Sequence, residues 1–228
     1  MTRYCIAFLF MLLPQCLVAE TEWQPEVESD DPQAVKTWIK KVSGASVNAF
    51  RGEVVVTHPP LEVLMVLDQP EAFPRWVFQC KGAQRVPGKG LYLQFRGIWP
   101  VSDRDAALVS TPSLAADRIV IHTVNQEDVM AEQPGYVRIP KLDNRFELIP
   151  LASGGTRIIF ETFVDPGGIV PGFISNIVAK KGPLITLTGL KAELDSASEQ
   201  TGSVDALSRI YDPIRTELRS FLLEASGQ

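Results

Sequence analysis

The middle of the chain alternates apolar and polar residues in short runs that are separated by Gly, Pro, Asp and Asn. Runs with this period of two are typical of strands, and Gly- or Asp-containing breaks of this length are typical of hairpin turns. The predicted strands are residues 80–86, 90–97, 106–110, 118–124, 136–139, 145–150 and 156–164. The predicted turns are residues 87–90, 116–117, 143–144 and 153–155. Short connections between neighbouring strands predict an antiparallel sheet, without the crossovers of nucleotide-binding folds.

On either side of this region the apolar spacing is mostly helical. Residues 35–42 carry apolar side chains three and four apart, which predicts a helix, and residues 47–57 follow as a strand. Pro60 suits the first turn of a second helix. A long amphipathic helix is predicted from Pro171 to Leu194, and we expect Pro183 to kink it. The fold class is therefore α+β, and wrapping a curved antiparallel sheet around the long helix buries that helix most simply.

The C-terminal residues 200–228 are predicted to be a linker followed by an amphipathic helical tail. Its apolar positions are Leu207, Ile210, Ile214, Leu218, Phe221 and Leu222. Three interpretations of the tail remain open at this point: a lid over a pocket, a partner-binding element, or additional packing.

Residues 1–19 have the features of a cleaved signal peptide. Arg3 precedes an apolar stretch that is too short for a confident membrane span, and Ala19 offers a small residue for cleavage. An alternative is lipidation at Cys16, although the residues before it match a lipoprotein signal poorly. We therefore expect export to a periplasm-like compartment. Cleavage would leave Cys80 as the one remaining cysteine, without an internal disulfide.

Composition and charge exclude several function classes. The net charge of −5 argues against nucleic-acid binding, which relies on clustered Lys and Arg. Two histidines and one mature cysteine do not make a structural zinc site, and no G-x-S-x-G segment points to a hydrolase triad. We expect no metal and no cofactor.

Four segments carry a resemblance to a known family. Residues 99–105 (Trp-Pro-Val-Ser-Asp-Arg-Asp) resemble the W-P-x-S-D-R-D signature of START domains, the lipid-binding modules of the helix-grip fold. Residues 73–76 (Phe-Pro-Arg-Trp), 165–171 and 181–191 resemble three further motifs of this family, in the same order. The resemblance identifies residues 20–199 as a START-like lipid-binding domain.

The resemblance implies a single lipid or other apolar molecule in an internal cavity between the sheet and the last helix, without catalysis. It also implies transient membrane contact as the ligand enters and leaves. Sequestration in such a cavity removes apolar surface from water at roughly 25 cal/mol per Å².

Arg104 admits two interpretations. It could present a guanidinium to a polar group of the ligand, or it could form structural ion pairs with its neighbours Asp103 and Asp105, since a buried charge needs a partner. Some sterol-binding relatives carry a second cavity arginine six residues further on. Ser110 stands there in this chain, so the ligand would meet weaker polar groups.

The other cavity candidates could equally be core residues. They are Phe95, Trp99 and His122 in the strand region, and Phe173, Ile177, Leu184 and Leu187 on the last helix. Two alternative functions also stay open. One is a helix-grip enzyme of the cyclase or hydrolase kind, with His122 as the catalytic group, and the other is a partner-binding module that uses the tail.

Overall fold

The computed structural model describes residues 22–45, 47–197 and 202–227. The predicted signal peptide lies outside the described residues, as do Cys5 and Cys16. No helix within the described ranges is long and apolar enough to cross a membrane.

One sheet of ten strands forms the frame of the described protein, in the order β1-β2-β3-β10-β9-β7-β6-β5-β4. All pairs along this path are antiparallel, as predicted, and the short β8 adds to β6 in parallel. The strands are β1 (Gln24–Val27), β2 (Lys36–Lys41), β3 (Asn48–Val56), β4 (Cys80–Val86), β5 (Gly90–Phe95), β6 (Arg104–Leu114), β7 (Ile119–Asn125), β8 (Val137–Arg138), β9 (Lys141–Pro150) and β10 (Thr156–Asp165).

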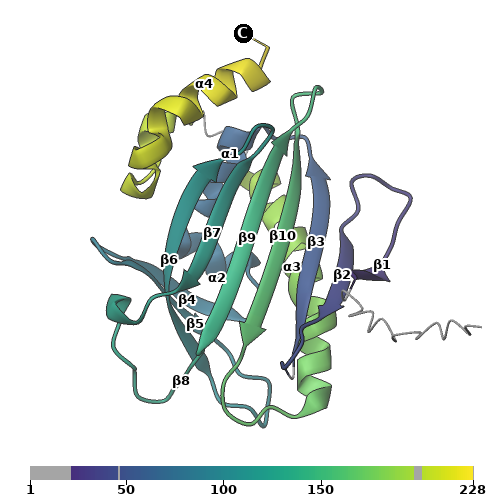
Figure 1. Cartoon of the computed structure of the whole chain (residues 1–228), viewed down its shortest axis with the longest axis vertical. Helices are drawn as coiled ribbons and strands as arrows, with labels where there is room; N and C mark the ends of the chain where they lie inside the picture. The colour runs from purple at the N-terminus through teal and green to yellow at the C-terminus, as the bar shows by residue number, and fades with distance from the viewer. Residues whose placement is uncertain (1–21, 46, 198–201, 228) are drawn as a thin grey trace, which may run out of the picture.

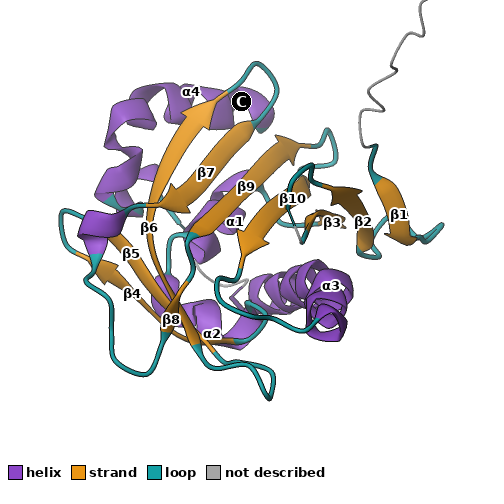
Figure 2. Cartoon of the chain, turned by 60° about the horizontal axis from the view of Figure 1, so that its bottom comes forward, coloured by secondary structure: helices purple, strands orange, loops and turns teal. Residues whose placement is uncertain are grey.

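The helices gather mainly on one side of this sheet. In Figures 1 and 2 the sheet curls from β1 to β4 around α1, α2 and the long α3, while α4 lies across the upper end of β6 and β7. The α-helices are α1 (Pro60–Leu67), α2 (Phe73–Trp76), α3 (Gly172–Ala197) and α4 (Arg215–Ala225). The described chain also has four short 3-10 segments, η1 (Pro70–Ala72), η2 (Glu127–Val129), η3 (Val204–Ala206) and η4 (Arg209–Ile214). This arrangement confirms the predicted curved antiparallel sheet wrapped around a long helix.

Two local predictions were wrong. Residues 35–42 form no helix, because Lys36–Lys41 pair with both β1 and β3 and tertiary hydrogen bonding outweighs the helical spacing of four apolar residues. Asp143 and Asn144 form no turn, because they continue β9 and pair with β7 and β10. The alternation of inner and outer side chains therefore runs unbroken through β9.

The C-terminal half of α3 packs tightly against the sheet and α2. A Cβ atom at Gly52 of β3 would lie 2.5 Å from Cδ1 of Leu187, and one at Gly189 would lie 2.8 Å from the carbonyl oxygen of Trp76. Gly189 therefore needs to be glycine, because a Cβ atom there would meet backbone, whereas a Cβ atom at Gly52 would displace the end of the Leu187 side chain. Leu187, Leu190 and Leu194 are accordingly buried in the main core.

The tail packs onto the body of the protein through Asp68 and two buried side chains. The Asp68 carboxylate accepts hydrogen bonds from Ser208 N at 2.6 Å, Ser208 Oγ at 2.7 Å and Arg85 Nη2 at 2.8 Å. Tyr211 and Leu218 are almost completely buried in the core. The described tail is thus attached to the end of α1, where Asp68 also binds Arg85 of β4.

His58 links α1 to the C-terminal end of α3. Its Nδ1 lies 2.8 Å from Glu62 Oε2, and its Nε2 lies 3.0 Å from Asp195 Oδ1. Burial alone would lower the pKa of His58, but the hydrogen bonds to Asp195 and Glu62 outweigh it, so the pKa lies above its usual 6.5. The protonated imidazole joins two carboxylates of two helices.

We expect this bridge to make stability depend on pH. Because the folded pKa of His58 exceeds the unfolded one, the stabilisation is complete below about pH 6.5 and is lost as the pH rises through the folded pKa. His58→Gln should therefore lower the melting temperature more at about pH 6 than at about pH 9. An equal fall in melting temperature at both pH values would show that the protonated His58 does not stabilise the fold.

Candidate functional site

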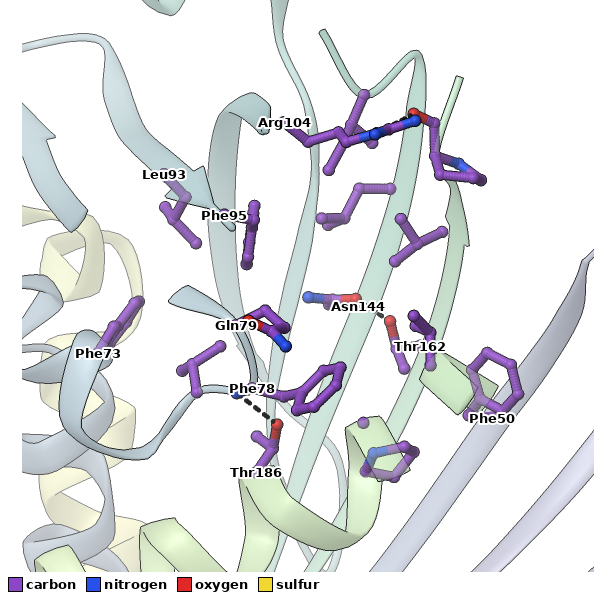
Figure 3. Close-up of a pocket in the computed structure, with 18 of the residues that line it drawn as sticks. Phe50, Phe73, Phe78, Gln79, Leu93, Phe95, Arg104, Asn144, Thr162 and Thr186 are labelled. Carbon is purple, nitrogen blue, oxygen red and sulfur yellow. Dashed lines mark hydrogen bonds between the residues drawn. The ribbon is translucent and has the colours of Figure 1, made fainter. Parts of the chain in front are cut away.

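A cavity of about 280 Å³ lies between the inner face of the sheet and the N-terminal half of α3. Ile174, Val178, Gly182, Pro183 and Thr186 line it from α3, facing inner positions of β3, β5, β6, β7, β9 and β10. Its remaining walls are the junction of α2 with β4 and the two loops of residues 96–103 and 166–171. Figure 3 shows the space bordered by aromatic and aliphatic side chains, with a few polar groups between them.

Polar lining groups are paired mostly with one another. Thr162 Oγ1 donates a hydrogen bond to Asn144 Oδ1, and the hydroxyl groups of Ser110 and Thr123 lie 2.8 Å apart. On the helical wall, Thr186 Oγ1 accepts a hydrogen bond from the backbone N–H of Phe78 at 3.2 Å. The interior is therefore apolar with isolated hydrogen-bonding positions, the usual composition of a small-molecule site.

The two aspartates beside Arg104 are bound elsewhere. Asp103 accepts hydrogen bonds from Lys81 Nζ and from the backbone N–H of Gly97. Asp105 is fully buried and accepts two from the guanidinium of Arg138, at 2.9 and 3.0 Å, and one from Tyr92 Oη at 3.0 Å. The predicted ion pairs of Arg104 with Asp103 and Asp105 are therefore wrong.

Arg104 instead donates to backbone carbonyl groups of two loops. Its guanidinium binds the carbonyl oxygen of Ser102 in the first loop and those of Pro166 and Gly167, each at 3.4 Å, in the second. Burial lowers the pKa of the Arg104 guanidinium, and the negative charge of nearby Asp103 partly offsets this lowering. Arg104 lines the cavity and ties together the loops of residues 96–103 and 166–171.

Of the three other candidates in the strand region, one lines the cavity and two do not. Phe95 lines the cavity. Trp99 is 88% exposed at the tip of its loop, so it is a surface residue and not a cavity residue. His122 points to the outer face, where its Nε2 lies 2.8 Å from Asp143 Oδ1 and its side chain is 45% exposed. Its place on the outer face follows from the register of β7, whose Ile121 and Thr123 take the inner positions.

Three of the helix candidates, Ile177, Leu184 and Leu187, lie beside the cavity without lining it. Leu187 is fully buried against Gly52, Leu184 is half-buried, and Ile177 is partly exposed. The side chain of Phe173 lies outside the described part of the chain. The stripe of α3 that faces the ligand space is rotated from the predicted one and contains Ile174, Val178, Gly182, Pro183 and Thr186.

Sequence reasoning missed Gln79, Asn144 and Thr162. All three line the cavity, as Figure 3 shows. The available signal was a polar residue at an inner position of an otherwise apolar strand, Asn144 between Leu142 and Phe146 and Thr162 between Phe160 and Val164. The predicted turn at Asn144 concealed the first case.

Replacing Arg104 should loosen the two loops that it joins. Arg104→Met leaves the carbonyl oxygens of Ser102, Pro166 and Gly167 without their charged donor, which costs about 2 kcal/mol of unfolding free energy. Limited proteolysis should then cleave within residues 96–103 and 166–171 sooner than in the wild type. Arg96→Met changes an exposed arginine of the same loop and serves as the matched control. If Arg104→Met and Arg96→Met are cleaved by the protease at the same rate, Arg104 does not hold the loops.

Comparisons with known proteins agree with this architecture. A STAR-related lipid transfer protein fragment from Xanthomonas axonopodis matches with a TM-score of 0.68 and 26% identity, over 76% of this chain and 98% of the fragment. Human StAR-related lipid transfer protein 5 matches with a TM-score of 0.65 and 16% identity, over 79% and 89% of the two chains. An uncharacterised protein of Pseudomonas aeruginosa is 26% identical over 167 residues, which are 71% of this chain and 83% of that protein. No protein-family model matches the sequence.

Proposed function

We propose that this chain, which has the START fold, is a non-catalytic carrier of one lipid or other apolar molecule. The observation that carries the proposal is the apolar cavity of about 280 Å³ between the sheet and α3. A compact core has few voids larger than a water molecule, so a cavity of this size inside a folded domain calls for an occupant. The predicted signal peptide would place the carrier in a periplasm-like compartment.

The chemistry of the lining favours binding over catalysis. Among the described lining residues there is no carboxylate, histidine, thiol or lysine, so the cavity walls offer no general base that could activate the lining Ser and Thr hydroxyl groups. His122, the candidate of the enzymatic alternative, lies on the opposite face of the sheet. The packing of the described tail against Asp68 supports a bracing role in preference to a free partner-binding arm.

Filling the cavity should abolish binding without unfolding the protein. Val164 lines the cavity from β10, so Val164→Trp places an indole in the ligand space. We expect at least a tenfold loss of bound lipid in native mass spectrometry and in solvent extracts of the purified protein. Phe163→Trp puts the same side chain on the opposite face of the same strand and should retain the lipid. Full occupancy of a folded Val164→Trp variant would overturn the proposal.

We also propose that the carrier exchanges its ligand while it is docked on a membrane surface. The two loops joined by Arg104 line the cavity, and each carries an exposed apolar tip, Trp99 at 88% and Ile169 at 95% exposure. Tryptophan is favoured at the boundary between lipid headgroups and acyl chains. The net charge of −5 gives no general attraction to anionic lipid, so apolar insertion is the stronger source of affinity.

The docking proposal predicts a loss of vesicle binding. The double variant Trp99→Ala with Ile169→Ser should reduce sedimentation with phosphatidylcholine vesicles, and the rate of lipid transfer between vesicles, by about tenfold, as two lost apolar contacts imply. Leu223→Ser removes an exposed apolar residue of α4 as the control. If the double variant transfers lipid at the wild-type rate, these loops are not the docking surface.

A further inference from the structure

Four polar side chains form one row across the inner face of the sheet. Ser110 of β6 pairs in register with Thr123 of β7, Thr123 pairs with Asn144 of β9, and Asn144 pairs with Thr162 of β10. All four line the cavity. We call these residues the polar row.

Apolar rows lie on both sides of the polar row. On one side Ile121, Phe146 and Phe160 are register partners, with the two phenyl rings stacked at 4.4 Å between centroids. On the other side Leu142 pairs with Val164. These five residues also line the cavity, so the polar row crosses the middle of the apolar sheet wall.

The hydrogen bonds of the polar row leave donors for a ligand. Thr162 donates to Asn144 Oδ1, so the amide N–H₂ group of Asn144 remains as a donor, and the structure shows no partner for it among the described residues. Ser110 and Thr123 share one hydrogen bond, so one of their two hydroxyl protons remains available to donate to a ligand. An apolar cavity that presents unpaired N–H and O–H groups favours a ligand with an acceptor oxygen at that level.

Gln79 supplies a second amide from the junction of α2 and β4. It is the one non-glycine residue with positive φ in the described chain, at 56°, and its carbonyl oxygen accepts a hydrogen bond from Arg96 N at 2.8 Å. Glutamine is unfavourable in this conformation, and such outliers concentrate at binding and active sites. Figure 3 shows the amide groups of Gln79 and Asn144 both directed into the cavity.

We infer that the polar row and Gln79 bind an uncharged oxygen function of the ligand, a carbonyl or hydroxyl group with apolar parts on either side of it. This inference rests on the proposed carrier function and names the ligand class. The groups that would meet this oxygen are amides and hydroxyls without formal charge. The charged lining residues of the described chain are Arg104, at the start of β6, and Arg96, whose side chain is exposed in the loop between β5 and β6. Arg104 stands six residues before Ser110, about 20 Å along an extended strand.

A matched pair of ligands tests the inference. Hexyl hexanoate and tridecane have chains of equal length, and the first carries an ester in its middle. Each is titrated against the protein loaded with the neutral apolar fluorophore N-phenyl-1-naphthylamine. We expect Asn144→Leu to lower the ratio of ester affinity to alkane affinity about tenfold relative to the wild type, as the loss of one buried hydrogen bond implies.

The control places the same side chain on the other face of the same strand. Asp143→Leu is directed outward, so it should leave the ratio at its wild-type value. An unchanged ratio in Asn144→Leu, with the fluorophore still bound and displaced, would overturn the inference and leave the carrier function intact. Failure of the wild-type protein to bind the fluorophore or either ligand would contradict the carrier function itself.

Gln79→Gly separates a binding role from a structural one. Glycine adopts the positive φ without strain, so the variant should keep or raise the melting temperature while it lowers the ester-to-alkane ratio. A fall in melting temperature with an unchanged ratio would assign Gln79 a structural role and remove it from the site.

Discussion

The close packing of the C-terminal half of α3 is the constraint on which the rest of the structure depends. Gly52 and Gly189 allow this half to approach β3 and α2 closely, so Leu187, Leu190 and Leu194 complete the core. The N-terminal half of the same helix faces the sheet with Ile174, Val178 and Gly182, and the cavity lies there. One helix therefore has two tasks, because one half closes the core while the other forms a wall of the ligand space.

This division explains how the domain tolerates a cavity. Empty space in a core forfeits packing energy, so the stability of the protein must come from elsewhere. The core half of α3, the Asp68 contacts to the tail and the His58 bridge all lie away from the two loops that line the cavity. At the loops themselves, the buried Arg104 binds carbonyl oxygens and, among the residues that the structure describes, no carboxylate. The side-chain hydrogen bonds of Arg104 that join these loops are therefore separate from the contacts that hold the core.

Much of the fold was predictable, because alternation and turn chemistry are local properties. The strand predictions for residues 80–86 and 156–164 came within one residue of β4 and β10. Residues 35–42 were assigned to a helix because their four apolar residues fit a helical period, and only pairing with β1 and β3 decides for a strand. Asn144 was assigned to a turn because Asp-Asn is common in turns, whereas register with Thr123 and Thr162 keeps it in β9.

The sequence by itself determined the family resemblance, the antiparallel character of the sheet and the long helix that follows it, since these follow from motifs and periodicity. The tertiary structure decided which side chains meet. It paired Asp103 with Lys81 and Asp105 with Arg138, left Arg104 to join two loops, and turned His122 outward. It also aligned Ser110, Thr123, Asn144 and Thr162, which are up to 52 residues apart in the chain, in one row. Strand register sets such neighbours, and register is a property of paired strands that no single segment contains.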